Sequence, residues 1–190
     1  MNGETITVEY DLSTAKTLKN PLERFRDVKT FVFDVDGVMT DGKVLVLETG
    51  EHLRTYSAKD GYAIRRALEE GYNVCIITGG VGGSIDNRMK KLKVLQYYTN
   101  AEDKVPVFRR YCEANGINPA DVLYMGDDLN DYTVMQKVGL ATCPLDACVE
   151  IQSICHYISP VKGGDGCVRD VIEKVMRVHQ TWMKHLTVSG

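Results

Sequence analysis

The sequence predicts a three-layer α/β fold with a mostly parallel β-sheet. Short apolar, β-rich segments alternate along the chain with segments whose apolar residues recur at helical spacing. This alternation is typical of a parallel sheet with helices on both faces. The chain has 190 residues, which agrees with a single domain because a domain typically holds about 150 residues. In such a sheet, ligands bind beyond the carboxyl ends of the strands.

The chain is expected to divide into an N-terminal arm at 1–28, which includes a short helix, and a folded domain at 29–190. The apolar run 31–33 ends in acidic residues and predicts the first buried strand. Two β-rich runs on either side of a turn with Gly50 predict a β-hairpin over 43–57.

The remaining elements follow from apolar periodicity and from capping residues. Helices are expected over 60–70, 84–92, 105–116 and 146–154, from 167 onward, and after the acidic residues at 127–128 through Val138, with Gly139 as its stop. Strands are expected over 73–78, 122–125 and 140–143. Ser84 and Asp146 are expected to cap the amino termini of their helices, and Gly71 to end the helix at 60–70.

The composition narrows the class of protein. Lys and Arg number 23 against 26 Asp and Glu, a net charge of −3, which argues against nonspecific nucleic-acid binding and against a basic membrane-surface protein. No apolar run approaches the length of a bilayer span, and the N-terminus lacks the features of a signal peptide. The six cysteines include no CxxC pair and are expected to be reduced. We therefore expect a cytoplasmic protein with no nucleic-acid or membrane partner.

Polar residues follow three of the predicted strands. These are Asp34 and Asp36 after the first, Thr78 and Gly79 after the second, and Asp127, Asp128 and Asp131 after the third. If the strands are parallel, all three ends meet at one edge of the sheet. Crowded carboxylates repel one another and raise their pKa values. A divalent cation relieves this repulsion, and hard oxygen ligands favour Mg²⁺, which often takes further ligands from a phosphate group.

The second strand end also favours phosphate binding. The hydroxyl of Thr78 and the N–H groups of Gly79 and Gly80 precede a predicted helix, where phosphate oxygens can be held. Lys104 near another helix start adds a cation. The segment matches neither of the usual glycine-rich nucleotide-binding patterns. Each residue alone has an ordinary structural explanation, but their combined order along the chain indicates a functional site.

This set of motifs resembles the haloacid dehalogenase (HAD) superfamily of phosphohydrolases. The matching segments are FDVDGVMTDG at 33–42, IITGG at 76–80, Lys104 and YMGDDLND at 124–131. The resemblance implies a Rossmann-like core in which Asp34 attacks phosphorus and forms an aspartyl-phosphate. It implies that Asp36 protonates the leaving alcohol and then activates water. It also implies Mg²⁺ bound by Asp34, the backbone carbonyl of Asp36 and Asp127.

The resemblance gives roles to the other motif residues as well. Asp128 and Asp131 would support the metal ligands and orient Lys104. Thr78, the Gly79 N–H and Lys104 would hold the transferring phosphoryl group. This arrangement stabilises charge and fixes position, which is what phosphoryl transfer requires.

The spacing of the motifs leaves no room for a cap domain. The segment 37–77 must already hold the hairpin and a helix, and 83–103 holds little more than one helix; a domain below about 40 residues is rarely stable alone. The segments 36–42, 59–62 and 163–170 resemble the capless subgroup of 3-deoxy-D-manno-octulosonate 8-phosphate (KDO 8-phosphate) phosphatases.

That subgroup resemblance implies a homotetramer whose hairpins meet at the centre, and a sugar-acid phosphate substrate used in KDO and lipopolysaccharide biosynthesis. The substrate carries a carboxylate, and an arginine recognises a carboxylate through two hydrogen bonds. Arg54, Lys59 and Arg169 are the expected substrate-binding cations.

Three alternatives stay open at this point. Many octulosonate phosphatases have ITGR at the second motif where this chain has ITGG at 77–80; the second form also occurs in phosphatases of the nine-carbon 2-keto-3-deoxy-nonulosonate (KDN) 9-phosphate. A receiver-like phospho-signalling domain is disfavoured because receivers lack the GDDxxD motif. A non-catalytic subunit is disfavoured because every motif residue is intact.

Overall fold

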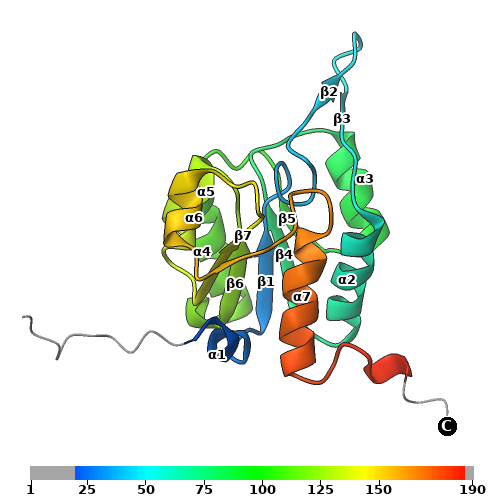
Figure 1. Ribbon diagram of the computed structural model, residues 1–190. Helices are drawn as coiled ribbons and strands as arrows, with labels where there is room; N and C mark the ends of the chain where they lie inside the picture. The colour runs from blue at the N-terminus through cyan, green and yellow to red at the C-terminus, as the bar shows by residue number, and fades with distance from the viewer. Residues whose placement is uncertain (1–19, 187–190) are drawn as a thin grey trace, which may run out of the picture.

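The computed structural model describes residues 20–186. A six-stranded sheet lies between two layers of helices (Figure 1), and its strand order is β5-β4-β1-β6-β7-β8. All neighbouring strands of this sheet pair in parallel. The strands are β1 (Thr30–Phe33), β4 (Asn73–Ile77), β5 (Gln96–Tyr98), β6 (Val122–Met125), β7 (Leu140–Cys143) and β8 (Tyr157–Ile158). The predicted three-layer α/β fold is confirmed.

The helices divide between the two faces of the sheet. They are α1 (Pro21–Phe25), α2 (Ala58–Glu69), α3 (Gly83–Leu92), α4 (Lys104–Asn115), α5 (Leu129–Met135), α6 (Val149–Ile154) and α7 (Cys167–Val178), with short 3-10 turns at Pro119–Asp121 and Lys184–Leu186. One face is covered by α2, α3 and α7, and the other by α4, α5 and α6.

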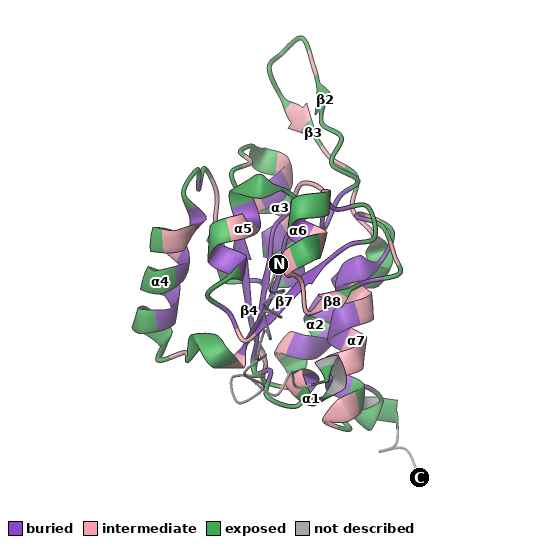
Figure 2. Ribbon diagram, turned by 60° about the vertical axis from the view of Figure 1, so that its left-hand side comes forward, coloured by how far each residue is buried: buried purple, intermediate pink, exposed green. Residues whose placement is uncertain are grey.

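The alternation of side chains along β1 explains why both faces are covered. Phe31 and Phe33 point into the core beneath α2, α3 and α7, whereas Val32 points into the core beneath α4, α5 and α6. All residues of β1 are buried, and Figure 2 shows the sheet buried between helices that are exposed on their outer sides. A strand that is buried on both faces is expected to be largely apolar, and β1 is apolar except for the buried Thr30 at its start.

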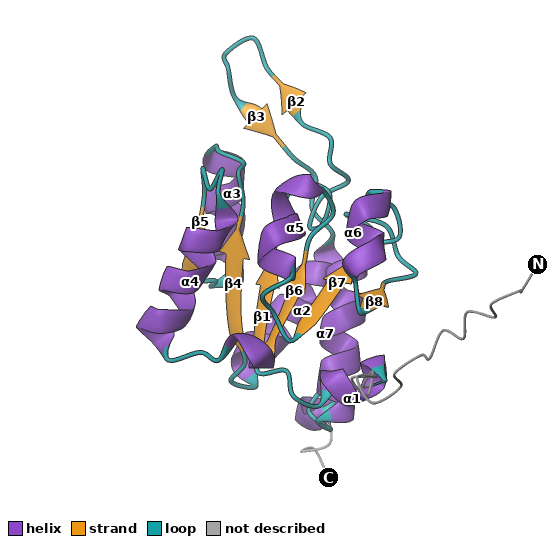
Figure 3. Cartoon of the chain, turned by 90° about the vertical axis from the view of Figure 1, so that its left-hand side faces the viewer, coloured by secondary structure: helices purple, strands orange, loops and turns teal. Residues whose placement is uncertain are grey.

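The hairpin stands away from the body of the protein, above the carboxyl ends of the strands (Figures 1 and 3). It consists of β2 (Leu45–Val46) and β3 (His52–Leu53), which pair antiparallel. The paired region is shorter than the predicted 43–57. Leu45 is 62% exposed and Val46 is 59% exposed. Within residues 20–186, neither inserted segment forms a separate cap domain.

Several details differ from the expectation. The strands β5 and β8 were not predicted, because they have only three and two residues and are partly exposed. Ser84 does not cap α3, which begins after Gly82; its hydroxyl donates to the carbonyl of His52 instead. Asp146 does not cap α6, because it accepts a hydrogen bond from the Gly163 N–H. In both cases a tertiary partner replaces the helix terminus.

The predicted N-terminal arm lies largely outside the described residues. Its described part contains α1, and the boundary between 1–28 and 29–190 stays a prediction. Within residues 20–186, no helix combines the length and the apolar composition that a bilayer crossing requires.

Candidate active site

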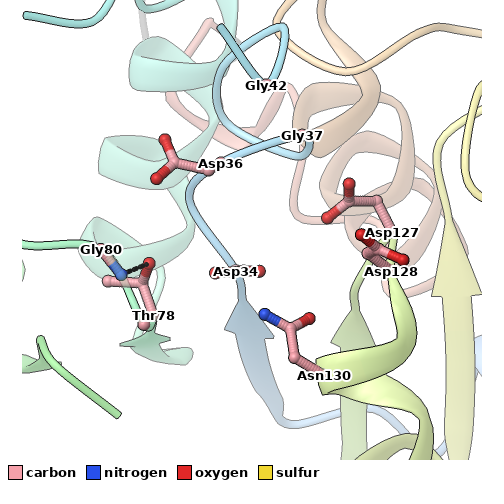
Figure 4. Close-up of a pocket in the computed structure, with 10 residues that line it drawn as sticks. Asp34, Asp36, Gly37, Gly42, Thr78, Gly80, Asp127, Asp128 and Asn130 are labelled. Atoms are coloured by element: carbon pink, nitrogen blue, oxygen red, sulfur yellow. Dashed lines mark hydrogen bonds between the residues drawn. The ribbon is translucent and has the colours of Figure 1, made fainter. Parts of the chain in front are cut away.

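The candidate site is a pocket of about 250 Å³ at the carboxyl ends of β1, β4 and β6. These strands are neighbours in the sheet, so the three polar strand ends meet, as the sequence predicts. The lining residues are Asp34, Asp36, Gly37, Gly42, Thr78, Gly79, Gly80, Asp127, Asp128 and Asn130. Figure 4 shows Asp34 in the middle of the pocket residues, with Asp127 and Asp128 on one side and Thr78 and Gly80 on the other.

Asp34 is held in place from two directions. Its side chain follows β1, and its Oδ1 accepts a hydrogen bond from the Val35 N–H at 2.6 Å. Its Oδ2 lies 2.6 Å from the Nζ of Lys104. The residue is only 4% exposed, so the carboxylate has a fixed orientation at the base of the pocket.

Lys104 is buried between two carboxylates. It begins α4, which is capped by the Asp103 side chain, and its Nζ lies 2.6 Å from Asp34 and 2.7 Å from Asp131. The Asp131 side chain is fully buried and also accepts hydrogen bonds from the Tyr124 hydroxyl at 2.7 Å and the Asp127 N–H at 3.2 Å. Asp131 therefore fixes the ammonium group, which in turn contacts Asp34.

Charge is not balanced inside this cluster. Burial raises the pKa of Asp34 to about 7, and the negative charge of Asp131 adds to the effect. Burial raises the pKa of Asp127 to about 8, with further contributions from Asp34 and Asp131. Burial alone lowers the pKa of Lys104, but the two adjacent carboxylates outweigh it and raise this pKa. Three carboxylates around one ammonium group leave an excess of negative charge that a bound cation would offset.

The carboxylates are suited to holding a hard metal ion. One oxygen from each of Asp34, Asp127 and Asp131 lies within 4.8 Å of the others. Asp34 and Asp127 line the pocket, whereas Asp131 does not, and its carboxylate accepts hydrogen bonds from Lys104 and Tyr124. Oxygen ligands of this kind fit Mg²⁺. Asp34 and Asp127 are thus the side chains best placed to contact such an ion.

Gly37 leaves the space that the Asp127 carboxylate occupies in the pocket. Its φ is +84°, and a Cβ atom there would lie 1.9 Å from the Oδ2 of Asp127. Any side chain would displace the carboxylate. Asp128 lies on the same side of the pocket, where its carboxylate caps α5 by accepting from the Leu129 N–H at 2.8 Å.

Thr78 and Gly79 form the opposite wall. Thr78 follows β4, is 1% exposed, and accepts a hydrogen bond from the Gly80 N–H at 3.0 Å. This contact shapes the turn at 78–80 so that it faces Asp34 (Figure 4). A hydroxyl and backbone N–H groups in such a turn can hold phosphate oxygens.

The three expected substrate-binding cations do not line the pocket. Arg54 forms a two-point ion pair with Asp36, with its Nε 2.7 Å from Oδ1 and its Nη2 2.9 Å from Oδ2. Lys59 is exposed in the first turn of α2. Arg169 in α7 pairs with Glu173 at 3.0 Å. Their contact with substrate stays a prediction.

Besides Gly37, three residues of the site were not singled out from the sequence. Asn130 and Gly42 line the pocket, and Tyr124 holds Asp131 from inside β6. Asn130 and Tyr124 lie within the YMGDDLND segment, and Gly42 ends the FDVDGVMTDG segment. Their position inside the two motifs could have identified them as candidate site residues. Tyr124 lies within the apolar run at 122–125 that is expected to form a strand, and this run gives no sign of a polar contact.

The sequence is similar to known proteins over most of its length. Residues 95–171 match the haloacid dehalogenase-like hydrolase family. A KDO 8-phosphate phosphatase from Yersinia pestis is 33% identical over 170 residues, which cover 90% of this chain and 91% of the relative. One from Escherichia coli strain K12 is 34% identical over 155 residues, which cover 82% of each chain.

The folds agree as well. The crystal structure of the Yersinia pestis phosphatase superposes with a TM-score of 0.85 at 31% identity and covers 87% of this chain and 90% of that chain. The chain therefore belongs to the haloacid dehalogenase-like hydrolases and, among them, to the family of KDO 8-phosphate phosphatases.

Proposed function

We propose that the protein is a Mg²⁺-dependent phosphatase that hydrolyses KDO 8-phosphate to KDO and inorganic phosphate through an aspartyl-phosphate on Asp34. The observation that carries the proposal is the fixed Asp34 carboxylate, 2.6 Å from Lys104, at the base of a pocket with phosphate-binding groups on its wall. The names of relatives that are 33–34% identical over most of the chain support the substrate.

Two displacement steps account for the reaction. In the first, an oxygen of Asp34 bonds to phosphorus while the bond from phosphorus to the sugar oxygen breaks, and Asp36 gives that oxygen a proton. In the second, Asp36 takes a proton from water, the water oxygen bonds to phosphorus, and the bond to Asp34 breaks. Lys104, Thr78 and the Gly79 N–H hold the phosphoryl oxygens through both steps.

Asp34 and Asp127 would bind Mg²⁺ together with the backbone carbonyl of Asp36, and Asp128 would support that shell. When bound, the ion supplies positive charge that offsets the negative charge of the carboxylates and of the phosphoryl group. Asp131 would hold Lys104 and would not bind the ion, because its carboxylate oxygens accept hydrogen bonds from Lys104, Tyr124 and the Asp127 N–H.

The assembly and the compartment are also part of the proposal. The exposed leucine and valine side chains on the hairpin support a homotetramer in which the hairpins pair, and an open site leaves room for a neighbouring subunit to contact the sugar through Lys59 or Arg169. All six cysteines are free thiols, which supports a cytoplasmic location because that compartment keeps thiols reduced.

The first prediction concerns the reaction. With Mg²⁺ present, the protein should release phosphate from KDO 8-phosphate with a higher kcat/KM than from KDN 9-phosphate. Asp34→Asn should lower kcat by at least about 10³-fold, because the nucleophile is lost. Asp121→Asn is the matched control, since Asp121 pairs with Lys29 on the surface and should leave kcat unchanged.

Steady-state phosphate release measures both effects. A higher kcat/KM for the nine-carbon substrate would contradict the substrate assignment and leave the chemistry intact. Full activity of Asp34→Asn would contradict the nucleophile itself.

The second prediction concerns pH and metal. The raised pKa values of Asp34 and Asp127 mean that the folded protein binds more protons than the unfolded chain between about pH 4 and about pH 8. The metal-free protein should therefore lose stability as pH rises through this window. Mg²⁺ binds the deprotonated carboxylates, so its stabilising effect should grow with pH.

Melting temperatures with EDTA and with Mg²⁺ at about pH 6 and about pH 8.5 provide the measurement. Asp127→Asn should abolish most of the Mg²⁺ effect. A Mg²⁺ effect that is the same at both pH values and in this variant would show that the ion binds elsewhere.

The third prediction concerns assembly. Leu45→Asp should convert the tetramer into smaller species, because it places a charge in the proposed hairpin contact. Leu95→Asp is the control, since Leu95 is 87% exposed and lies outside the hairpin. Light scattering gives the masses in solution, and a monomeric wild-type protein would rule the tetramer out.

A further inference from the structure

The ion pair between Arg54 and Asp36 buries the arginine side chain at the base of the exposed hairpin. The Arg54 side chain is only 2% exposed, although the residue directly follows the exposed strand β3. Its Nε and Nη2 both contact Asp36. Its Nη1 donates to the carbonyl of Val81 at 3.1 Å and lies 3.4 Å from the Ser84 hydroxyl. Every nitrogen of the guanidinium group is thus engaged within the protein.

The loop after β4 is shaped to admit this guanidinium group. A Cβ atom at Gly80 would lie 2.9 Å from the Nη2 of Arg54 and 2.9 Å from the Oδ2 of Asp36. The absence of a side chain at position 80 therefore creates the space in which the two groups meet. The Ser84 hydroxyl in turn donates to the carbonyl of His52 at 3.0 Å, which fastens the base of the hairpin to this loop.

The pair determines where the Asp36 carboxylate lies. Figure 4 shows that carboxylate on the side of the pocket formed by Thr78 and Gly80, away from Asp127. Two parallel N–H···O contacts from a planar guanidinium group fix both the position and the plane of a carboxylate. A lysine would fix neither, because an ammonium group offers one point of charge. Thr40 adds only a long contact of 3.4 Å to Oδ1.

We propose that Arg54 is a positioning residue that orients the Asp36 carboxylate, in a space left free by Gly80. This inference rests on the proposed function, in which Asp36 moves the protons. It also differs from the substrate-binding role expected from the sequence. A residue that binds substrate carboxylate contributes mainly to KM, whereas a residue that orients the acid and base contributes mainly to kcat.

The leaving group gives a further distinction. A sugar alcohol must be protonated as it leaves, so the first step with KDO 8-phosphate depends on a well-placed Asp36. Nitrophenolate leaves without a proton, so the first step with 4-nitrophenyl phosphate does not. The second step needs Asp36 with either substrate, because the water must lose a proton.

The experiment compares Arg54→Ala, Arg54→Lys and Gly80→Ala in the full chain with Mg²⁺. Arg54→Ala should lower kcat for KDO 8-phosphate by about 10- to 100-fold, which is part of the rate enhancement that acid–base catalysis typically contributes. Its KM should stay within about threefold of the wild-type value. With 4-nitrophenyl phosphate it should show a rapid burst of nitrophenolate near one per subunit, followed by slow turnover. Arg54→Lys should recover only part of kcat.

Gly80→Ala keeps Arg54 but places a methyl group where the Arg54 guanidinium group meets the Asp36 carboxylate. It should lower kcat for KDO 8-phosphate, as Arg54→Ala does. The variant with both substitutions should be no slower than Arg54→Ala, because both changes act on the Arg54–Asp36 ion pair. Arg65→Ala is the matched control, since the Arg65 side chain is 53% exposed on α2. Melting temperatures and the retained burst separate this effect from misfolding, which would remove the burst.

The outcomes distinguish the two proposals. Wild-type protein that turns over neither substrate overturns the proposed function and this inference together. Wild-type turnover combined with an unchanged kcat in Arg54→Ala, or with a raised KM alone, overturns the role of Arg54 and leaves the proposed function standing.

Discussion

The site depends on one buried cation. Lys104 is 1% exposed and contacts both Asp34 and Asp131, so two carboxylates are buried that would otherwise repel each other. Removing one partner from such a buried cluster typically costs about 3–5 kcal/mol, because an uncompensated charge remains. The same contacts with Lys104 thus both stabilise the buried Asp34 carboxylate and fix its position for its proposed attack on phosphorus.

The rest of the fold serves to bring these groups to one place. The parallel pairing of β4, β1 and β6 places the carboxyl ends of three strands side by side, and helices cover both faces of the sheet. Close packing then requires glycine at particular positions. Gly37 makes room for Asp127, and Gly80 makes room for Arg54 and Asp36. The pocket is therefore shaped as much by missing side chains as by the acids.

The sequence predicted the four longer strands of the sheet and the meeting of the polar strand ends, because local signals determine both. Apolar β-rich runs define the strands, and acids directly after them must lie at the carboxyl edge. It did not predict the partner of Arg54, since that contact joins residues 18 positions apart through a hairpin whose direction is a tertiary property. Ser84 was misassigned as a cap for the same reason, because its partner is the carbonyl of His52 in the hairpin.

Covalent catalysis by Asp34 is tested most directly by identifying the phosphorylated side chain. Wild-type protein in steady-state turnover with Mg²⁺ would be quenched in acid, digested and examined by mass spectrometry. We expect a phosphoryl group on Asp34, in the peptide that contains FDVDG, and none in the same peptide of Asp34→Asn. Phosphate release without any phosphopeptide, or a phosphoryl group on a different residue, would contradict it.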